Sequence, residues 1–213
     1  MATSPSKPVD AEKTRIMLGL LESVERGDAH SQRLLASELG VALGLVNAYL
    51  RRCVSKGLVK VRQAPARRYA YYLTPRGFSE KSRLTVEYLS YSLSHFRRAR
   101  QDCTAALQAA GARGYGRVAF LGVSELAEIA AICALESGVT VVAVVDPAAQ
   151  SERFVGVPVW STIDGGAPLD AVLVTDINDT YRTIEAAVAR LGAERVFVPA
   201  LLGATPARDG GAG

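Results

Sequence analysis

The sequence is poor in the residues that build metal centres and disulfide frameworks. Its 213 residues include two histidines and three cysteines, and Cys53, Cys103 and Cys133 lie far apart in the chain. An odd number of scattered cysteines fits neither a disulfide framework nor the ligand spacing of a zinc site. We therefore expect no metal site and a reducing, cytoplasmic environment.

Long apolar runs are also missing. No run of about 18 apolar residues occurs, so we expect no transmembrane helix and no membrane partner. The first residues, MATSPSKPVDAEK, lack the apolar core of a signal peptide, so none is expected. Apolar residues still make up 49% of the chain, which is enough for the core of one large or two small domains.

Acidic residues are scarce in the first half of the chain and abundant in the second. Residues 1–110 hold 18 Lys/Arg and 9 Asp/Glu, a net charge of +9, whereas residues 111–213 hold 7 and 12, a net charge of −5. A basic module suits a polyanionic partner such as nucleic acid. The acidic half must have a different task.

The basic half contains the pattern of a helix-turn-helix. Ser31 is a good N-cap, and Leu34, Leu35 and Leu39 then recur at helical spacing before Gly40 ends the helix. A second helix is expected over about residues 42–56. Its expected inner stripe is Val46, Leu50, Cys53 and Val54, and its expected outer face is Asn47, Arg51, Arg52 and Ser55.

A two-stranded wing is expected directly after this second helix. Residues 58–62 and 69–73 favour strands, and the loop between them carries Arg67 and Arg68. Together these elements predict a winged helix-turn-helix that binds double-stranded DNA. The candidate DNA-binding residues are Ser31, Gln32, Gly44, Asn47, Arg51, Arg52, Arg67 and Arg68. The alternatives are a helical hairpin packed in a core and a solvated basic turn.

The domain organisation follows from composition. We expect a disordered arm over 1–9, the winged helix-turn-helix over 10–74, a long connecting helix over 75–110, a second domain over 117–200 and a flexible tail over 201–213. The long helix carries scattered apolar residues: Leu84, Tyr88, Tyr91, Leu93 and Phe96. A second copy would cover them, which predicts a homodimer, unless the helix packs only on its own chain.

The second domain alternates short apolar strands with helices, so the fold class is α/β overall, with a Rossmann-like parallel sheet. The expected strands are 118–123, 139–146, 170–175 and 195–198, with an edge strand over 154–160; the expected helices are 124–137 and 179–191.

The turn after the first parallel strand resembles a dinucleotide-binding turn in part. Gly122 is present, but Ser124 stands in place of the middle glycine, and Glu125 would repel an anion at the helix N-terminus. Asp146 ends the second strand, where it would accept hydrogen bonds from ribose hydroxyls.

A further loop carries Asp176 and Asn178. The candidate ligand-binding set is Gly122, Ser124, Glu125, Asp146, Asp176 and Asn178. Its acidic residues favour a sugar, a nucleoside or a cation over a naked phosphate. Ser124 and Asp146 alternatively serve only as a helix cap and a strand end, and Asn178 or Asp179 only as the cap of the next helix.

The second domain contains no histidine, and no catalytic constellation emerges from it. We therefore assign no catalytic residues and expect that the chain is not an enzyme.

Some stretches resemble known families. SQRLLASELGVALGLVN, GLVKV and YYLTPRGFSEKSRLT resemble MarR-type winged-helix regulators associated with exopolysaccharide gene clusters, over about residues 11–100. Leu45 departs from the basic or polar residue expected there. The layout is similar to Rex repressors, which bind NAD(H), although their full glycine motif is lacking. VAFLGVSELAEIA, VVAVVD and VGVPVW resemble nucleotide-binding domains of sugar-modifying enzymes.

These observations predict a homodimeric transcription regulator, of the repressor type, with a C-terminal sensor or oligomerisation module. The ligand remains open, with NAD(H) and a nucleotide-sugar as candidates. The alternative is a nucleotide-dependent enzyme or enzyme subunit that uses its winged helix for protein interaction.

Overall fold

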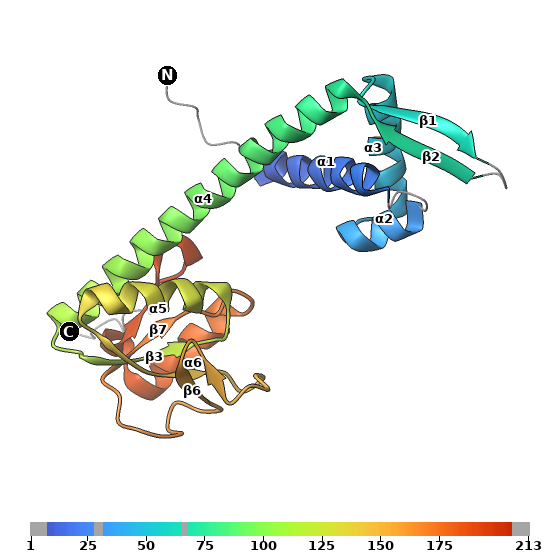
Figure 1. The fold of residues 1–213 in the computed structure, drawn as a ribbon. Coiled ribbons are helices and arrows are strands. Elements are labelled where there is room, and N and C mark those ends of the chain that lie inside the picture. The colour runs from blue at the N-terminus through green and yellow to red at the C-terminus, as the bar shows by residue number, and fades with distance from the viewer. Residues whose placement is uncertain (1–7, 28–31, 65–67, 206–213) are drawn as a thin grey trace, which may run out of the picture. The chain divides into compact units, whose positions relative to one another are not determined.

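A computed structural model describes residues 8–27, 32–64 and 68–205, and the chain divides into two compact units, residues 1–94 and 95–213 (Figure 1). The first unit is a winged helix-turn-helix and the second holds a largely parallel sheet. The predicted fold class, an α/β chain with these two folds, is therefore confirmed.

Three helices build the first unit: α1 (Pro8–Arg26), α2 (Gln32–Leu39) and α3 (Leu43–Ser55). Their inward residues share one core, whose fully buried members include Leu20, Leu21, Leu35, Val46 and Cys53. One residue predicted to face this core does not. Val54 is 39% exposed, because it lies at the margin of the apolar stripe of α3.

The wing consists of β1 (Val59–Ala64) and β2 (Arg68–Leu73), which pair antiparallel. Val59 pairs with Leu73 at the base, where both pack against the helical core, and Val61 pairs with Tyr71 further out. Ser31 and Arg67 lie outside the described residues.

No single described helix is long and apolar enough to cross a membrane. The pair α2 and α3 passes that test only when joined, but the two helices meet at a bend of 108°. Their buried side chains belong to the core of the winged helix-turn-helix.

The helix α4 (Pro75–Ala112) starts at a polar junction with the wing. The Thr74 hydroxyl donates to the carbonyl of Gly57 at 2.7 Å and accepts from the amide of Gly77 at 3.0 Å. The hydroxyl therefore caps α4 and also ties it to the end of the turn after α3. A Cβ on Gly77 would lie 2.2 Å from the Leu58 carbonyl, so only glycine permits this close approach.

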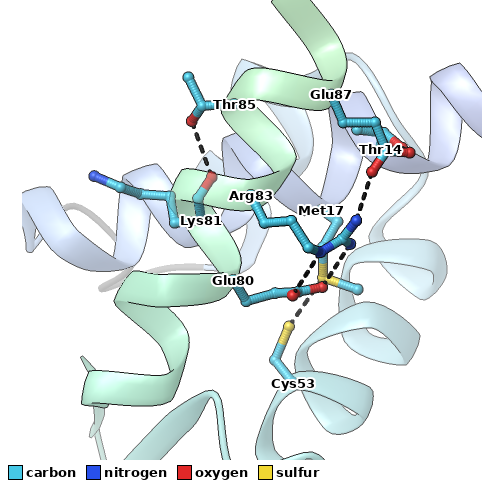
Figure 2. A network of polar contacts seen from close by, with 8 residues as sticks. All are labelled: Thr14, Met17, Cys53, Glu80, Lys81, Arg83, Thr85 and Glu87. Atoms are coloured by element: carbon cyan, nitrogen blue, oxygen red, sulfur yellow. Dashed lines mark hydrogen bonds and ion pairs between the residues drawn. The ribbon is translucent and has the colours of Figure 1, made fainter. Parts of the chain in front are cut away.

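Charged side chains fix the start of α4 against α1 (Figure 2). Arg83 donates to Glu80 at 2.9 Å and to Glu87 at 2.6 Å, and the Thr14 hydroxyl of α1 donates to Glu87 at 3.4 Å. Lys81 also pairs with Glu25 of α1.

The second unit is built on a six-stranded sheet of order β5-β6-β4-β3-β7-β8. Its strands and helices are β3 (Arg117–Leu121), α5 (Glu125–Ser137), β4 (Thr140–Val145), β5 (Arg153–Phe154), β6 (Val157–Trp160), β7 (Ala171–Val174), α6 (Thr180–Leu191) and β8 (Val196–Phe197). Short 3-10 turns precede and follow β8, at Ala193–Arg195 and Ala200–Leu202. The strands β6, β4, β3, β7 and β8 run parallel.

Two cores cover the two faces of this sheet, because neighbouring strand residues point to opposite sides. Val118 and Phe120 pack under α5 and the C-terminal part of α4, whereas Ala119 and Leu121 pack under α6. Figure 1 shows α5 and α6 on opposite sides of β3 and β7.

The edge strand predicted over residues 154–160 is wrong in form. The structure has a hairpin there, in which β5 is the antiparallel edge and β6 pairs parallel with β4. Val155 and Gly156 make the turn with φ values of 46° and 84°. Positive φ values at both central residues are typical of the type I′ turn, which is common in two-residue hairpins.

The start of α6 is held by Asp176 rather than by the predicted cap residues Asn178 or Asp179. The Asp176 carboxylate accepts from the amides of Asn178 at 2.8 Å and Asp179 at 3.1 Å, and from the Thr183 hydroxyl at 2.7 Å. Burial by itself raises the pKa of Asp176, but these hydrogen bonds outweigh it and hold the pKa below the ordinary 3.8.

This lowered pKa predicts a pH-dependent contribution to stability. The charged carboxylate stabilises the fold above pH 3.8, and its contribution is lost as the pH falls through the lower folded-state pKa. We expect Asp176→Asn to lower the free energy of unfolding by about 1–3 kcal/mol at pH 7 and to weaken the acid dependence, as measured by urea unfolding across pH.

Asp179→Asn is the matched control, because the Asp179 side chain makes no capping hydrogen bond. Equal stability and equal acid dependence of the two variants would contradict the assigned role of Asp176.

Candidate functional sites

A groove of about 630 Å³ lies between α3 and the wing in the first unit. Asn47 and Arg51 of α3 line one side, and Val61 and Tyr71 of the wing line the other. Gln32, at the start of α2, reaches the same groove and donates from its amide to the Tyr71 hydroxyl at 3.1 Å. Two helices and the wing thus meet around one concave surface.

The core decides which residues of α3 face outward. Burial of Val46, Leu50 and Cys53 leaves the opposite side of the helix to solvent, and Gly44, Arg51 and Arg52 are exposed there. Asn47 is half-buried at the edge of that side. The structure therefore brings together the predicted residues Gln32, Asn47 and Arg51 in the groove, with Gly44 and Arg52 on the outer face of α3.

The remaining predicted contacts are not placed. Ser31 and Arg67 lie outside the described residues, and Arg68 is described only as the first residue of β2.

The segment that forms this surface contains no acidic residue. No Asp or Glu occurs between Glu38 and Glu80. Over the same segment stand the basic residues Arg51, Arg52, Lys56, Lys60, Arg62, Arg67, Arg68 and Arg76. Of these, Arg51, Arg52, Lys56, Lys60, Arg62 and Arg76 are exposed. One sign of charge over a whole face attracts a polyanion.

Several wing residues at this surface were not predicted. Lys60 and Arg62 of β1 are exposed, and the Arg62 guanidinium lies 5.9 Å from the centre of the Tyr72 ring. Tyr71 reaches the groove from the other face of the hairpin. Strand alternation could have predicted their exposure. Successive strand residues point to opposite faces of the hairpin, so a buried Val59 places Val61 on its own face and Lys60 and Arg62 on the other.

A second cavity, of about 560 Å³, lies in the second unit at the carboxyl ends of the parallel strands. The chain leaves β3 toward β4 on one side of the sheet and continues from β7 to β8 on the other. Such a reversal of strand order opens a crevice, which is where ligands bind in open α/β sheets. Gly122, Asp146, Asp176 and Asn178 all line this cavity, as predicted for one sheet edge.

The acidic side chains of the cavity already hold backbone groups. The Asp146 carboxylate accepts from the amide of Val123 at 3.0 Å and from that of Ala148 at 2.9 Å. In a phosphate-binding turn, amides of this kind point at the ligand instead. Asp146 is therefore a structural support of the glycine turn, and each of its oxygens keeps lone-pair capacity for a further donor.

The turn itself is not shaped for a diphosphate. Ser124 caps α5, accepting from the Ala127 amide at 3.2 Å and donating to the Thr175 carbonyl at 2.6 Å. A Cβ on Gly122 would lie 2.7 Å from Asp176 Cα, so this glycine serves close packing of two loops. Ser124 and Glu125 do not line the cavity, so the predicted ligand-binding set is only partly assembled there.

The buried thiols are not poised for chemistry. Burial raises the pKa of Cys53 to about 11 and that of Cys103 to about 12. Among the described residues, no group of three or more His, Cys, Asp or Glu side chains is arranged to hold a metal ion.

Residues 14–60 match the family model described as winged helix-turn-helix DNA-binding. The match spans α2, α3 and the start of the wing, which hold the groove described above. A comparison with curated proteins finds no match. The MarR-type resemblance and the similarity in layout to Rex repressors remain predictions.

Among solved structures, the chain is similar to human N-acetylserotonin methyltransferase in complex with SAM. The alignment covers 93% of this chain and 81% of that one, at 12% identity and a TM-score of 0.37. The expectation that the chain is not an enzyme is withdrawn in view of this alignment, which at this TM-score carries no argument for any activity. Missing histidines do not exclude catalysis by positioning. A likeness this weak gives no support for methyl transfer by this chain.

Proposed function

We propose that the first unit binds double-stranded DNA through α3 and the wing. The observation that carries this proposal is the set of exposed basic residues on α3 and the wing, Arg51, Arg52, Lys60 and Arg62, in a segment without acidic residues. In winged helix-turn-helix proteins the second helix enters the major groove. Lysines and arginines around it would contact phosphates, and Asn47 and Arg51 would reach base edges.

The finer proposal is a transcription regulator of the repressor type that acts in the cytoplasm. Residues 10–74 would bind DNA, residues 75–110 would connect the parts, and residues 117–200 would form a sensor or oligomerisation module. A ligand in the second unit alters DNA binding only if it has different affinities for two states of the protein.

Replacing Arg51 tests the DNA interface. We expect Arg51→Ala to weaken binding to duplex DNA by roughly tenfold or more, the cost of a lost charged contact, as measured by fluorescence anisotropy. If Arg51 contacts a phosphate, the slope of log affinity against log salt also falls by about one.

Arg98→Ala is the control, because Arg98 is an exposed arginine outside the winged helix-turn-helix. Unchanged affinity of the Arg51 variant, or an equal loss in both variants, would refute the assigned interface.

Dimerisation through α4 is the second part of the proposal. Val86, Leu89, Leu93 and Phe96 recur at spacings of three and four, and they are 65%, 54%, 48% and 40% exposed. This spacing is that of a helix-pairing seam. Leu84, which was predicted to share this surface, is buried in the core of the first unit. The helical repeat places Tyr88 and Tyr91, predicted for the same surface, on the side of Leu84 rather than on the seam.

A charge in this seam tests the dimer. We expect Leu89→Glu to convert a dimer into a monomer in sedimentation velocity, because a carboxylate would be buried without a partner. Ser94→Glu is the control, since Ser94 is exposed on the same helix and the helical repeat places it away from the seam. A wild-type monomer would refute the proposed dimer.

A second candidate function is favoured by the cavity in the second unit, namely a nucleotide-dependent enzyme whose winged helix contacts protein. The volume of this cavity lies within the usual range of ligand sites, roughly 300–1,000 Å³. Asp146, Asp176 and Asp179 line it, against one cation, Arg182, whose side chain is 85% exposed. This charge balance favours the uncharged or cationic part of a ligand over its phosphates.

A ligand panel tests this cavity. We expect nucleosides to raise the melting temperature more than the matching 5′-diphosphates, NADH or nucleotide-sugars, and Asp146→Asn to reduce the shift relative to its own ligand-free state. A ligand at about 100 times its Kd adds about 2.7 kcal/mol, which is readily seen. Larger shifts with the diphosphates would contradict the charge argument.

Asp164→Asn is the control in this panel, because Asp164 pairs with Arg190 and does not line the cavity.

Two observations, ligand consumption and DNA affinity, separate the candidate functions. Chromatography of the incubated ligand shows whether it is consumed. Turnover without DNA affinity would favour the enzyme, and DNA affinity altered by an unconsumed ligand would favour the regulator.

A further inference from the structure

The outward side of α3 changes character along its length. Its C-terminal half presents Arg51, Arg52 and Ser55, whereas its first two turns present Leu43, Gly44, Leu45 and Ala48. The half-buried Asn47 in those first turns brings its amide to the groove, and the partly buried Tyr49 packs against the core. In a recognition helix, the first turns are the part that contacts base edges.

Leu45 is the most prominent of these apolar residues. Its side chain is 40% exposed, and it shares a line along the helix with the exposed residues Ala48 and Arg52, at spacings of three and four. A Cβ added to Gly44 would meet nothing within 4 Å, so the surface beside Leu45 is open. An apolar end followed by a basic end matches a groove whose floor holds bases and whose walls hold phosphates.

The chemistry of the major groove limits what such a surface can recognise. Three of the four bases offer only hydrogen-bonding groups there, and thymine adds a C5-methyl group. Leu45 and Ala48 have no hydrogen-bonding side chain, so the methyl group is the one base feature that they can bind favourably. Asn47 can pair with adenine N6 and N7.

We propose that Leu45 and Ala48 recognise thymine methyl groups in the major groove, with Asn47 on a neighbouring adenine, so that the bound half-site is centred on A·T pairs. This inference rests on the proposed DNA binding of the first unit. The competing occupant of the same apolar surface is a protein partner, which the segment's uninterrupted positive charge favours less than DNA.

Deoxyuridine provides a sharp test, because it lacks only the methyl group of thymidine and keeps its pairing. The full chain is first used to select duplexes from a random library. The selected duplex is then prepared with thymine or with uracil, and both affinities are measured at one salt concentration. We expect uracil to weaken binding by about fourfold per contacted methyl.

Two leucine variants assign the effect to α3. We expect Leu45→Ala to prefer the thymine duplex over the uracil duplex less strongly than the wild type does, because one of the two methyl-binding side chains has been shortened while Ala48 remains; an unchanged preference would refute the role of Leu45. Leu34→Ala removes the same atoms from a leucine of similar exposure on α2, and it should keep the wild-type preference for thymine. Circular dichroism of both variants confirms that α2 and α3 remain folded.

The remaining outcomes overturn the inference in distinguishable ways. Selected duplexes without A·T pairs, or equal wild-type affinity for thymine and uracil, would refute methyl recognition and leave DNA binding intact. No affinity for any duplex would refute both, and it would assign the apolar end of α3 to a protein contact.

Discussion

Burial of Val46, Leu50 and Cys53 is the constraint on which the proposed DNA-facing surface depends. These three side chains turn one side of α3 into the core formed with α1 and α2, and the helical repeat then places Gly44, Arg51 and Arg52 outside. The wing follows from the same core, since Val59 and Leu73 complete it at the base of the hairpin. Thr74 joins the wing to α4 through a hydroxyl that serves both elements. The interface is thus fixed by packing behind it rather than by contacts within it.

Periodicity made most of this unit predictable, and its failures have one cause. Helical spacing predicts Val54 in the inner stripe of α3, yet it lies at the edge of that stripe and is exposed. Sequence alone shows the repeat but not how wide a strip the neighbouring elements cover. The same limit applies to α4, where Leu84 is buried while Val86 and Leu89 are exposed. Which residues of a long helix meet a neighbour is decided by the neighbour's length.

The alternation of strands and helices in the second unit was predictable, whereas the hydrogen-bond partners of its polar residues were not. Sequence placed Gly122, Asp146 and Asp176 at one sheet edge, because parallel strands end on the same side, and the structure gathers them around one cavity. It could not reveal that Asp146 holds the Val123 amide or that Asp176, rather than Asn178 or Asp179, caps α6. The Asp146 hydrogen bond spans 23 residues, a separation that no spacing rule encodes. The Asp176 bonds have ordinary capping spacing, but Asp176, Asn178 and Asp179 are all candidate caps in one loop, so the sequence does not say which of them acts.

Phosphate has opposite consequences in the two units. Around α3 and the wing, exposed lysines and arginines stand on a segment without acids, so a phosphate backbone is attracted there whatever its sequence. The cavity of the second unit is lined by three carboxylates and one exposed arginine. The Val123 amide, which could otherwise donate to a phosphate, donates to Asp146 instead. A nucleic acid and a small ligand would therefore not compete for the same unit. In the proposed DNA complex, base recognition would come from Asn47, Arg51 and the apolar surface of α3, and a methyl group is the base feature that such an apolar surface binds.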